Sequence, residues 1–290
     1  MPRPHYLRAV ALQFEKWEGT GNDFVLVDGR QEGRLPSDWS DAEVEALCDR
    51  KRGVGSDGVV VVTPGDDGIL QVDFRNPDGS RSFCGNGTRS AVAWAHGEGV
   101  FKTDIRVEAF DGAHTGVLRA DGTPGVSLNV EAVPRVKMTL VPRAVHAAFL
   151  NTGSPHHVEW LDSASALDSL DLAQAALTAR HHSDYSPGGC NVSVVAKEGE
   201  CLLIRTFERG VEAETLSCGT GVVAAALADM AREDASAGSH VRHVIARGGR
   251  LEVEATRQAG GTFQDVWLFG AARHVFRGTW AWALAFLALW

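Results

Sequence analysis

A four-residue motif occurs twice in this chain, as Cys84-Gly85-Asn86-Gly87 and as Cys218-Gly219-Thr220-Gly221. In each copy a polar loop precedes the cysteine, and an alanine-rich stretch follows the second glycine. Glycine lets the backbone approach a ligand closely, and the N–H groups that begin a helix attract anions because they have no acceptor within the helix. The motif therefore predicts two helices, each with a cysteine and an anion-binding turn at its N-terminus.

The two motifs belong to a longer repeat. Thr20-Gly21 matches Thr152-Gly153 after 132 residues, Phe74 matches Phe207 after 133, and the two cysteines are 134 residues apart. Three matches in one order and at nearly one spacing indicate duplication of a unit. We therefore expect two pseudo-symmetric domains whose equivalent loops face each other across a cleft.

Local composition predicts many strands and few helices. The expected strands are 12–17, 24–28, 59–63, 70–75, 144–150, 157–160, 192–196 and 202–208, and the expected helical segments are 41–50, 91–96, 164–179 and 220–232. This order lacks the regular strand–helix alternation of a doubly wound parallel sheet, so the sequence favours an α+β fold.

Composition narrows the class of protein. The chain has 290 residues, of which 44% are hydrophobic and 22% charged, so it is long and apolar enough for a large core. A net charge of -9 without a basic stripe argues against a nucleic-acid partner. The five cysteines include no Cys-x-x-Cys pair, which favours a reducing compartment, and the N-terminus lacks an apolar stretch long enough for a signal peptide. We expect a cytoplasmic protein without a disulfide framework.

The C-terminal segment 279–290 is uncharged and rich in tryptophan and leucine. Its twelve residues are too few to cross a bilayer as a helix, which needs about 20. We expect no membrane span here and favour a helix that packs on the body of the protein or across a dimer interface, with weak membrane association as the alternative.

Two cysteines that face each other from related domains suit the inversion of a carbon stereocentre. One thiolate would remove the α-proton, and a thiol on the opposite face would deliver another. The positive end of a helix dipole favours thiolate, so a small shift from the free thiol pKa of about 8.5 would bring Cys84 and Cys218 near neutrality. The alternative is a pair of buried structural cysteines. Oxidation could link the two thiols and inactivate the protein.

Together the motifs make the chain resemble the diaminopimelate epimerase family over residues 14–278. The matching segments are 19–24, 53–58, 76–79, 84–87, 153–156, 191–192, 207–210 and 218–221. The resemblance implies two domains of like fold, each a curled mixed sheet around a central helix, with the active site in the cleft between them. It also implies that the final strand, near 265–269, returns to the first domain. The expected bounds are 12–130 with a returning strand near 265–278, 131–264, and the apolar tail 279–290.

The resemblance further implies interconversion of LL- and meso-diaminopimelate without pyridoxal phosphate, metal or another cofactor, in lysine and peptidoglycan precursor synthesis. The partner would be a small-molecule substrate, LL-2,6-diaminopimelate, and the family expectation is a homodimer. Cys84 and Cys218 match the acid–base pair, and His156 and Glu208 match residues that poise the thiols. Substrate-binding positions of the family fall on Asn22, Asn76, Gly85, Asn86, Ser154, Asn191, Glu208, Arg209, Gly219 and Thr220.

These site residues have simpler explanations too. Asn22 and Asn76 could cap turns, His156 could be an ordinary loop histidine, and Glu208 and Arg209 could form a surface ion pair. Asn191 could satisfy the backbone at the start of a strand. Ser154 replaces an asparagine found in many family members, and serine reaches less far toward the far end of the substrate.

Other functions fit the sequence less well. Residues 53–58 match the GxGxxG dinucleotide fingerprint, but a helix precedes and a strand follows, the reverse of the required order. The histidines and cysteines lack the usual spacing of a zinc site. A proline or hydroxyproline racemase also uses two cysteines but tends to have Cys-Gly-His-Gly where this chain has Asn86. A non-catalytic binding protein on the same fold is the alternative from another class, and the presence of both cysteines argues against it.

Overall fold

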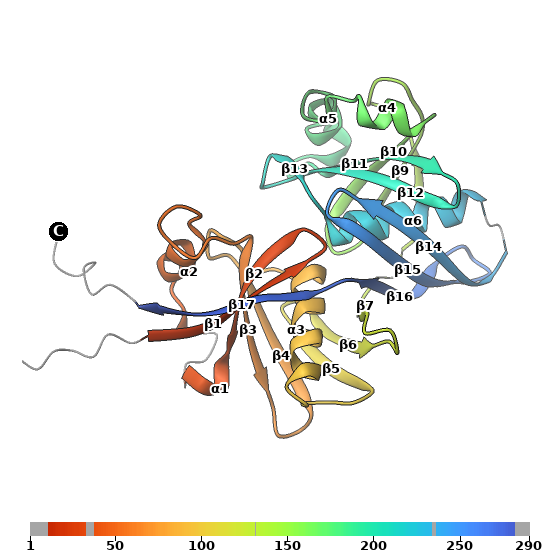
Figure 1. Ribbon diagram of the computed structural model, residues 1–290. Helices are drawn as coiled ribbons and strands as arrows, with labels where there is room; N and C mark the ends of the chain where they lie inside the picture. Colours follow the sequence, from red (N-terminus) through yellow and green to blue (C-terminus); the bar gives the residue numbers. More distant parts are fainter. Residues whose placement is uncertain (1–10, 33–37, 131, 234–235, 282–290) are drawn as a thin grey trace, which may run out of the picture.

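The computed structural model describes residues 11–32, 38–130, 132–233 and 236–281. Two lobes each hold a curved sheet and one long helix, α3 (Gly85–Gly97) in the first lobe and α6 (Gly219–Glu233) in the second (Figure 1). The expected α+β fold with two like domains is thereby confirmed. The division at residues 130 and 131 stays a prediction, because residue 131 lies outside the described residues.

The two halves repeat one order of strand pairing. From β1 to β7 consecutive strands pair antiparallel, parallel, antiparallel, parallel, antiparallel and antiparallel. From β9 to β16, omitting the short β13, the same series recurs. The strands of the first half are β1 (Ala11–Gly19), β2 (Asn22–Asp28), β3 (Gly58–Pro64), β4 (Ile69–Arg75), β5 (Asp104–Ala109), β6 (Gly112–Leu118) and β7 (Pro124–Leu128). Those of the second are β8 (Arg135–Lys137), β9 (Ala144–Asn151), β10 (Pro155–Leu161), β11 (Asn191–Glu198), β12 (Cys201–Glu208), β13 (Ala213–Thr215), β14 (Gly238–Ala246), β15 (Gly249–Arg257) and β16 (Phe263–Gly270).

Each central helix is buried by the strands around it. α3 follows β4 and α6 follows β12, so both helices occupy the same place in the repeat. The middle of α6 is a run of fully buried small residues, Ala224, Ala225 and Ala226, which allows the strands to approach the helix closely. Separate apolar clusters surround α3 and α6. The sequence therefore places the two cysteines at the ends of the most deeply buried helices.

Shorter helices cover the outer faces of the sheets. In the first half these are α1 (Gly29–Glu32) and α2 (Asp41–Cys48); in the second they are α4 (Ala164–Asp168), α5 (Leu172–Arg180) and the 3-10 turn η2 (Ser183–Tyr185). The prediction of a single helix over 164–179 was wrong, because the first helix ends at Asp168. Asp171 then caps a new helix by accepting a hydrogen bond from the Gln174 N–H.

Two strands join the halves. β16 pairs with β15 of its own half and with β7 of the first half, and β17 (Arg273–Ala281) pairs with β1. The expected returning segment 265–278 covers most of β16, whose residues 266–269 pair with β7 of the first half, and the beginning of β17, which pairs with β1. The first residues of the apolar segment, Thr279–Ala281, belong to β17, where Trp280 pairs with Leu12, so the expected helix is wrong for them. Residues 282–290 lie outside the described residues.

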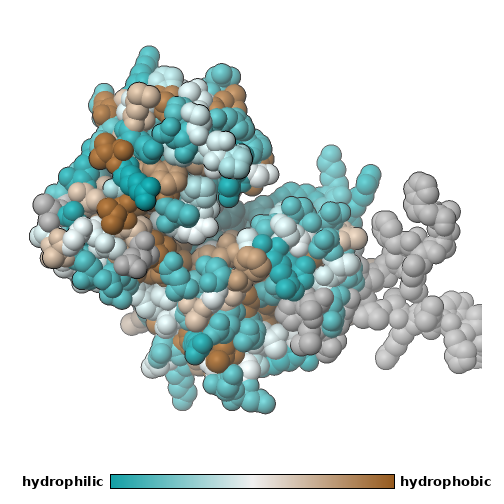
Figure 2. All heavy atoms as spheres, turned by 180° about the vertical axis from the view of Figure 1, so that it is seen from behind, coloured by the Kyte–Doolittle hydropathy of each residue, from teal (hydrophilic) through white to brown (hydrophobic). Residues whose placement is uncertain are grey.

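The surface is mainly hydrophilic on the face drawn in Figure 2, where hydrophobic side chains lie in scattered groups. No helix in the described part of the chain has both the length and the apolar composition needed to span a bilayer.

Candidate active site

The two helix N-termini meet between the lobes. Cys84 is the N-cap of α3, and Cys218 directly precedes Gly219, the first residue of α6. A Cβ atom at Gly219 would lie 3.5 Å from Asn86 Oδ1 and 3.9 Å from Gly85 Cα. The two Cys-Gly-x-Gly turns therefore face each other at close range.

The two thiols have similar surroundings. Cys84 Sγ accepts a hydrogen bond from the Gly87 N–H at 3.4 Å, and Cys218 Sγ lies 3.5 Å from Thr220 Oγ1. Both are free thiols, Cys84 half-buried and Cys218 buried. The sulfur atoms thus sit at the helix starts, as the motif predicts.

The expected thiol pKa values near neutrality were wrong. Loss of solvation raises the pKa of Cys84 to about 11, although the N–H groups of Gly87 and Asn86 act in the opposite direction. Burial also raises the pKa of Cys218 well above its ordinary value, and the negative charge of Glu208 adds to this effect at both thiols. Desolvation therefore outweighs the helix dipole, and both cysteines are protonated at neutral pH.

Glu208 ends β12 beside the two cysteines. It is a hydrogen-bond partner of Cys218 and accepts a hydrogen bond from Thr215 Oγ1. Burial raises the pKa of Glu208, and the nearby charge of Asp57 raises it further. A carboxyl group with a raised pKa next to a thiol is suited to exchange a proton with it.

His156 lies at the centre of a buried polar cluster. Its Nε2 atom is 2.9 Å from Thr220 Oγ1, 3.1 Å from Ser154 Oγ and 3.3 Å from Asn191 Nδ2, and its Nδ1 atom is 3.3 Å from Ser193 Oγ. Burial lowers the pKa of His156 to about 3, so the ring is neutral. His156 reaches Cys218 through the Thr220 hydroxyl, and it is fully buried rather than an ordinary loop residue.

Ser154 and Asn191 are held by this cluster. Ser154 Oγ contacts Thr220 Oγ1 at 3.0 Å as well as His156, and Asn191 Nδ2 donates to Ser154 Oγ at 3.0 Å and to the Pro155 carbonyl at 3.1 Å. Asn191 Oδ1 accepts from the Arg209 N–H at 2.8 Å. Asn191 therefore fixes the backbone from which the Arg209 side chain extends.

Arg209 itself is exposed, and its guanidinium has no ion-pair partner within the described ranges 11–32, 38–130, 132–233 and 236–281. In the described part of the chain Glu208 and Arg209 do not form an ion pair with each other, so the surface-pair alternative does not hold there. A free guanidinium at the edge of the site suits a carboxylate, which it can hold with two hydrogen bonds.

Asn22 and Asn76 are the two expected substrate-binding asparagines of the first half that lie outside the motifs, and only Asn22 contacts the Cys84 motif. Asn22 Oδ1 accepts from Asn86 Nδ2 at 2.5 Å, and its Nδ2 donates to Asp57 Oδ2 at 3.1 Å. Asn76 instead donates to the Ser80 carbonyl and to the hydroxyls of Ser80 and Ser82. Asn76 therefore braces the loop before Cys84, in agreement with the turn-capping alternative.

Sequence reasoning missed several residues at this site. Asp57 lies in the segment 53–58, which matches the family but was given no residue of the site, and Thr215 is three residues before Cys218. Leu268 contacts the Cβ positions of both Gly85 and Gly219. No local pattern marks Leu268, because it comes from β16, far along the chain from either motif.

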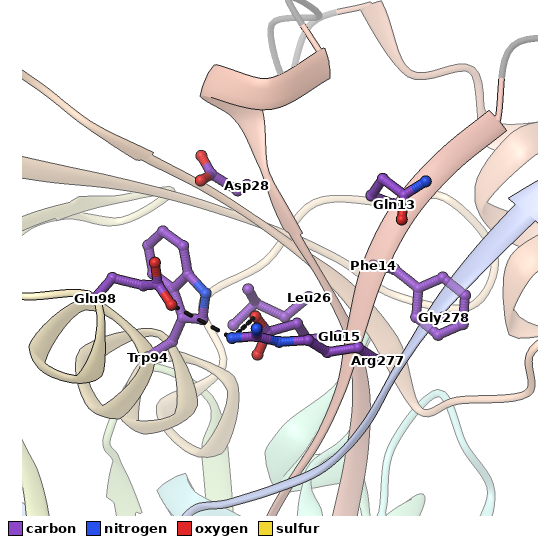
Figure 3. Close-up of a pocket in the computed structure, with 9 residues that line it drawn as sticks. All are labelled: Gln13, Phe14, Glu15, Leu26, Asp28, Trp94, Glu98, Arg277 and Gly278. Atoms are coloured by element: carbon purple, nitrogen blue, oxygen red, sulfur yellow. Dashed lines mark hydrogen bonds and ion pairs between the residues drawn. The ribbon is translucent and has the colours of Figure 1, made fainter.

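A separate cavity of about 180 Å³ lies beside β1, α3 and β17 and contains neither cysteine. Figure 3 shows Arg277 between two of its carboxylates, and Arg277 Nη2 pairs with Glu15 Oε1 at 3.0 Å and with Glu98 Oε1 at 3.4 Å. The charge of the Arg277 guanidinium is thus already balanced by these two carboxylates. The described residues hold no group of three or more metal-ligating side chains.

A pair of thiols on opposed helix N-termini defines the class of a two-cysteine racemase or epimerase. The family model for diaminopimelate epimerase matches residues 14–133 and 148–273. The chain is 34% identical over 270 residues to the diaminopimelate epimerase of Flavobacterium psychrophilum, covering 92% of this chain and 100% of that protein. It is 35% identical over 263 residues to that of Chlorobaculum tepidum, covering 90% and 98%. The chain belongs to the diaminopimelate epimerase family.

Solved structures share the fold at low sequence identity. A phenazine biosynthesis protein of the PhzF family from Bacillus anthracis has a TM-score of 0.71 at 12% identity, covering 94% of this chain and 99% of its own. A hydroxyproline epimerase from Agrobacterium vitis has a TM-score of 0.65 at 13% identity, covering 94% and 91%. These likenesses support the fold alone.

Proposed function

We propose that this protein is an isomerase that interconverts LL- and meso-diaminopimelate through a pair of cysteines. The observation that carries the proposal is the apposition of the two Cys-Gly-x-Gly turns in a chain of this family. The substrate α-carboxylate would lie on the N–H groups that begin α3 and α6, where the helix starts stabilise negative charge that develops at the reacting carbon.

The proton balance is simple. A thiolate on one face of Cα takes its proton, the electron pair of the broken C–H bond stays on the carbon, and the thiol on the other face protonates that carbon. The two sulfurs then have exchanged protonation states. Because both thiols are protonated in the free protein, one proton must leave first, and Glu208 is the carboxylate in contact with Cys218 that can accept it.

The far end of the substrate carries a second amino-acid group. We assign its carboxylate to Arg209, whose guanidinium extends from a backbone fixed by Asn191. Ser154 is committed to the cluster around His156, so it acts there rather than as a long-reaching substrate ligand. Asn22 lies next to Asn86 and supports the first turn. The protein would act in lysine and peptidoglycan precursor synthesis, in the cytoplasm and as a homodimer.

The test is a stereochemical assay in D2O with LL-diaminopimelate, using L-proline and trans-4-hydroxy-L-proline as competing candidates. Proton NMR should show loss of the α-proton signal and formation of the meso isomer with diaminopimelate only. Exchange with a proline substrate instead would move the chain to the racemase alternative, and no exchange with any of them would favour the binding-protein alternative. Sedimentation of the same sample measures whether it is a dimer.

A further inference from the structure

Arg89 is a fully buried cation in the helix that carries Cys84. It lies five residues after that cysteine, in the second turn of α3, and none of its surface is exposed. Charged side chains are almost never buried without a partner of opposite charge, because loss of hydration destabilises the charged form strongly. Burial lowers the pKa of Arg89 to about 10, so the guanidinium remains charged at neutral pH.

The guanidinium is only partly satisfied. Its Nε donates to the Gly270 carbonyl at 3.2 Å and its Nη2 donates to Thr20 Oγ1 at 2.8 Å. The buried Nη1 has no hydrogen-bond partner. No carboxylate pairs with Arg89 among the residues that the structure describes. Glu18 acts on it electrostatically but forms its ion pair with Arg273, at 2.5 Å.

Of the two acceptors, only Gly270 belongs to a strand that joins the lobes. Thr20 is in the β1–β2 turn, two residues before Asn22, and Gly270 ends β16 just before the chain crosses to β17. Thr20 also donates to the Ala271 carbonyl at 3.4 Å. Arg89 therefore joins three parts of the molecule: the helix of the first motif, the turn beside it, and the strand that carries Leu268.

The Cys84 sulfur, at the start of the same helix, can balance this charge as a thiolate. Arg89 and Cys84 interact electrostatically, and the interaction favours the thiolate. Glu208 acts on Cys84 in the opposite direction. A thiolate at Cys84 would therefore supply the negative charge that Arg89 lacks, and Arg89 would favour loss of the Cys84 proton against burial and Glu208, which both disfavour it.

We propose that Arg89 is a positioning residue whose buried positive charge favours the thiolate of Cys84 while its hydrogen bonds hold the first motif against the lobe crossing. This role deepens the proposed two-cysteine function and rests on it. A purely structural role would require the hydrogen bonds to Thr20 and Gly270 but not the charge.

The test is alkylation of Cys84 by iodoacetamide at pH 9 without substrate, with the labelled Cys84 peptide quantified by mass spectrometry. Loss of a nearby opposite charge raises a pKa by about one unit or more. At pH 9 this lowers the thiolate fraction about tenfold. A more basic thiolate is about threefold more nucleophilic, which offsets part of the loss in alkylation rate. Arg89→Met should therefore be alkylated about threefold more slowly or worse. Arg89→Lys should be slowed in the same way, because burial lowers the pKa of a lysine at this position and leaves it largely neutral at pH 9. Thr20→Val, which removes only neutral hydrogen bonds, should stay within about twofold of the unmodified protein.

Circular dichroism verifies that each variant is folded. A folded Arg89→Met protein that reacts at the original rate overturns the proposal. If Arg89→Met does not fold, the other two variants decide: slowing of Arg89→Lys beyond threefold together with the original rate in Thr20→Val supports the proposal, and any other result overturns it. The assay contains no substrate, so failure of the diaminopimelate reaction in D2O would reject the proposed function without altering this result.

Discussion

Gly85 and Gly219, the first residues of α3 and α6, lie against the same side chain. A Cβ atom at Gly85 would be 3.3 Å from Leu268 Cδ2, and one at Gly219 would be 3.2 Å from it. Leu268 is fully buried in the core around α6. One leucine from the strand that joins the halves therefore sets how closely the two cysteine turns approach.

Replacing Gly219 by alanine should disturb this spacing. A contact of 3.2 Å is too short for two carbon atoms, so Leu268 or the start of α6 must move by a few tenths of an ångström. Because small displacements of catalytic groups lower rates strongly, we expect Gly219→Ala to reduce kcat/KM for diaminopimelate by about tenfold, with a loss of about 1 to 3 kcal/mol in the free energy of unfolding. Steady-state kinetics and urea titration measure both.

Gly97→Ala is the matched control. Gly97 ends α3, and a Cβ atom there meets nothing within 4 Å. We expect unchanged kinetics and a gain of up to about 1 kcal/mol in stability. Original kinetics in Gly219→Ala would show that the separation of the turns does not limit catalysis.

Cys84→Ala and Cys218→Ala should each remove epimerisation and leave the fold intact. Inversion needs a proton acceptor on one face of the carbon and a donor on the other, and each acid–base group contributes about 10²- to 10⁴-fold. NMR detection of the meso isomer gives the rate. Cys201→Ala, at the start of β12, is the control and should stay active. More than about a tenth of the original turnover in either motif variant would contradict a two-base mechanism.

The duplication could be predicted from the sequence because the features that reveal it are local and recur. These features are the glycine turns and the residues around them. The matched Thr20-Gly21 and Thr152-Gly153 do lie in equivalent turns, between β1 and β2 and between β9 and β10. The split of the segment 164–179 was missed because alanine and leucine favour a helix throughout, whereas Asp171 restarts it.

The thiol pKa values could not be predicted from the motif. A helix N-terminus is visible in sequence, but the burial that raises the pKa of Cys84 to about 11 arises from strands and loops distant in the chain. The same holds for the contact between Asn22 and Asn86, whose partners are 64 residues apart. Long-range packing, rather than local pattern, sets the electrostatics of the site.

Arg209→Lys should weaken substrate binding selectively. Lysine keeps the charge but loses the planar fork, and hydrogen bonds to charged groups contribute about 1.5 to 3 kcal/mol each, so KM should rise about tenfold or more with little change in kcat. Arg106→Lys provides the control, because Arg106 is exposed on β5 and pairs with Glu108 at 2.5 Å. If kcat falls instead while KM is unchanged, Arg209 acts at the reacting carbon.

Stability should decline in mild alkali because of the two thiols. An unfolded cysteine has a pKa of about 8.5, whereas burial raises that of folded Cys84 to about 11. The folded state therefore retains a proton that the unfolded state releases, and the contribution is complete below about pH 8.5 and lost as the pH rises to about 11. Urea unfolding at pH 8 and pH 10 should show a smaller decline for Cys84→Ala than for the unmodified protein. Equal declines would mean that Cys84 titrates normally in the folded state.

His156 should make the folded protein less stable as the pH falls below about 6.5. Its folded pKa of about 3 lies below the unfolded value of about 6.5, so the unfolded state binds a proton that the buried ring refuses. The contribution is present above about pH 6.5 and is lost as the pH falls toward 3, which amounts to roughly 3 kcal/mol between pH 7 and pH 4.

His156→Gln cannot take up this proton, so its stability should fall less over the same interval, even though it loses contacts with Thr220 and Ser154 at every pH. Ser193→Ala removes one neutral hydrogen bond to the ring and keeps the histidine, so it should retain the original pH dependence. Urea unfolding of the three proteins at pH 7 and pH 4 measures the difference. A decline in His156→Gln as steep as in the unmodified protein would show that His156 accepts a proton while folded, and that the cluster around Thr220 can hold a charged ring.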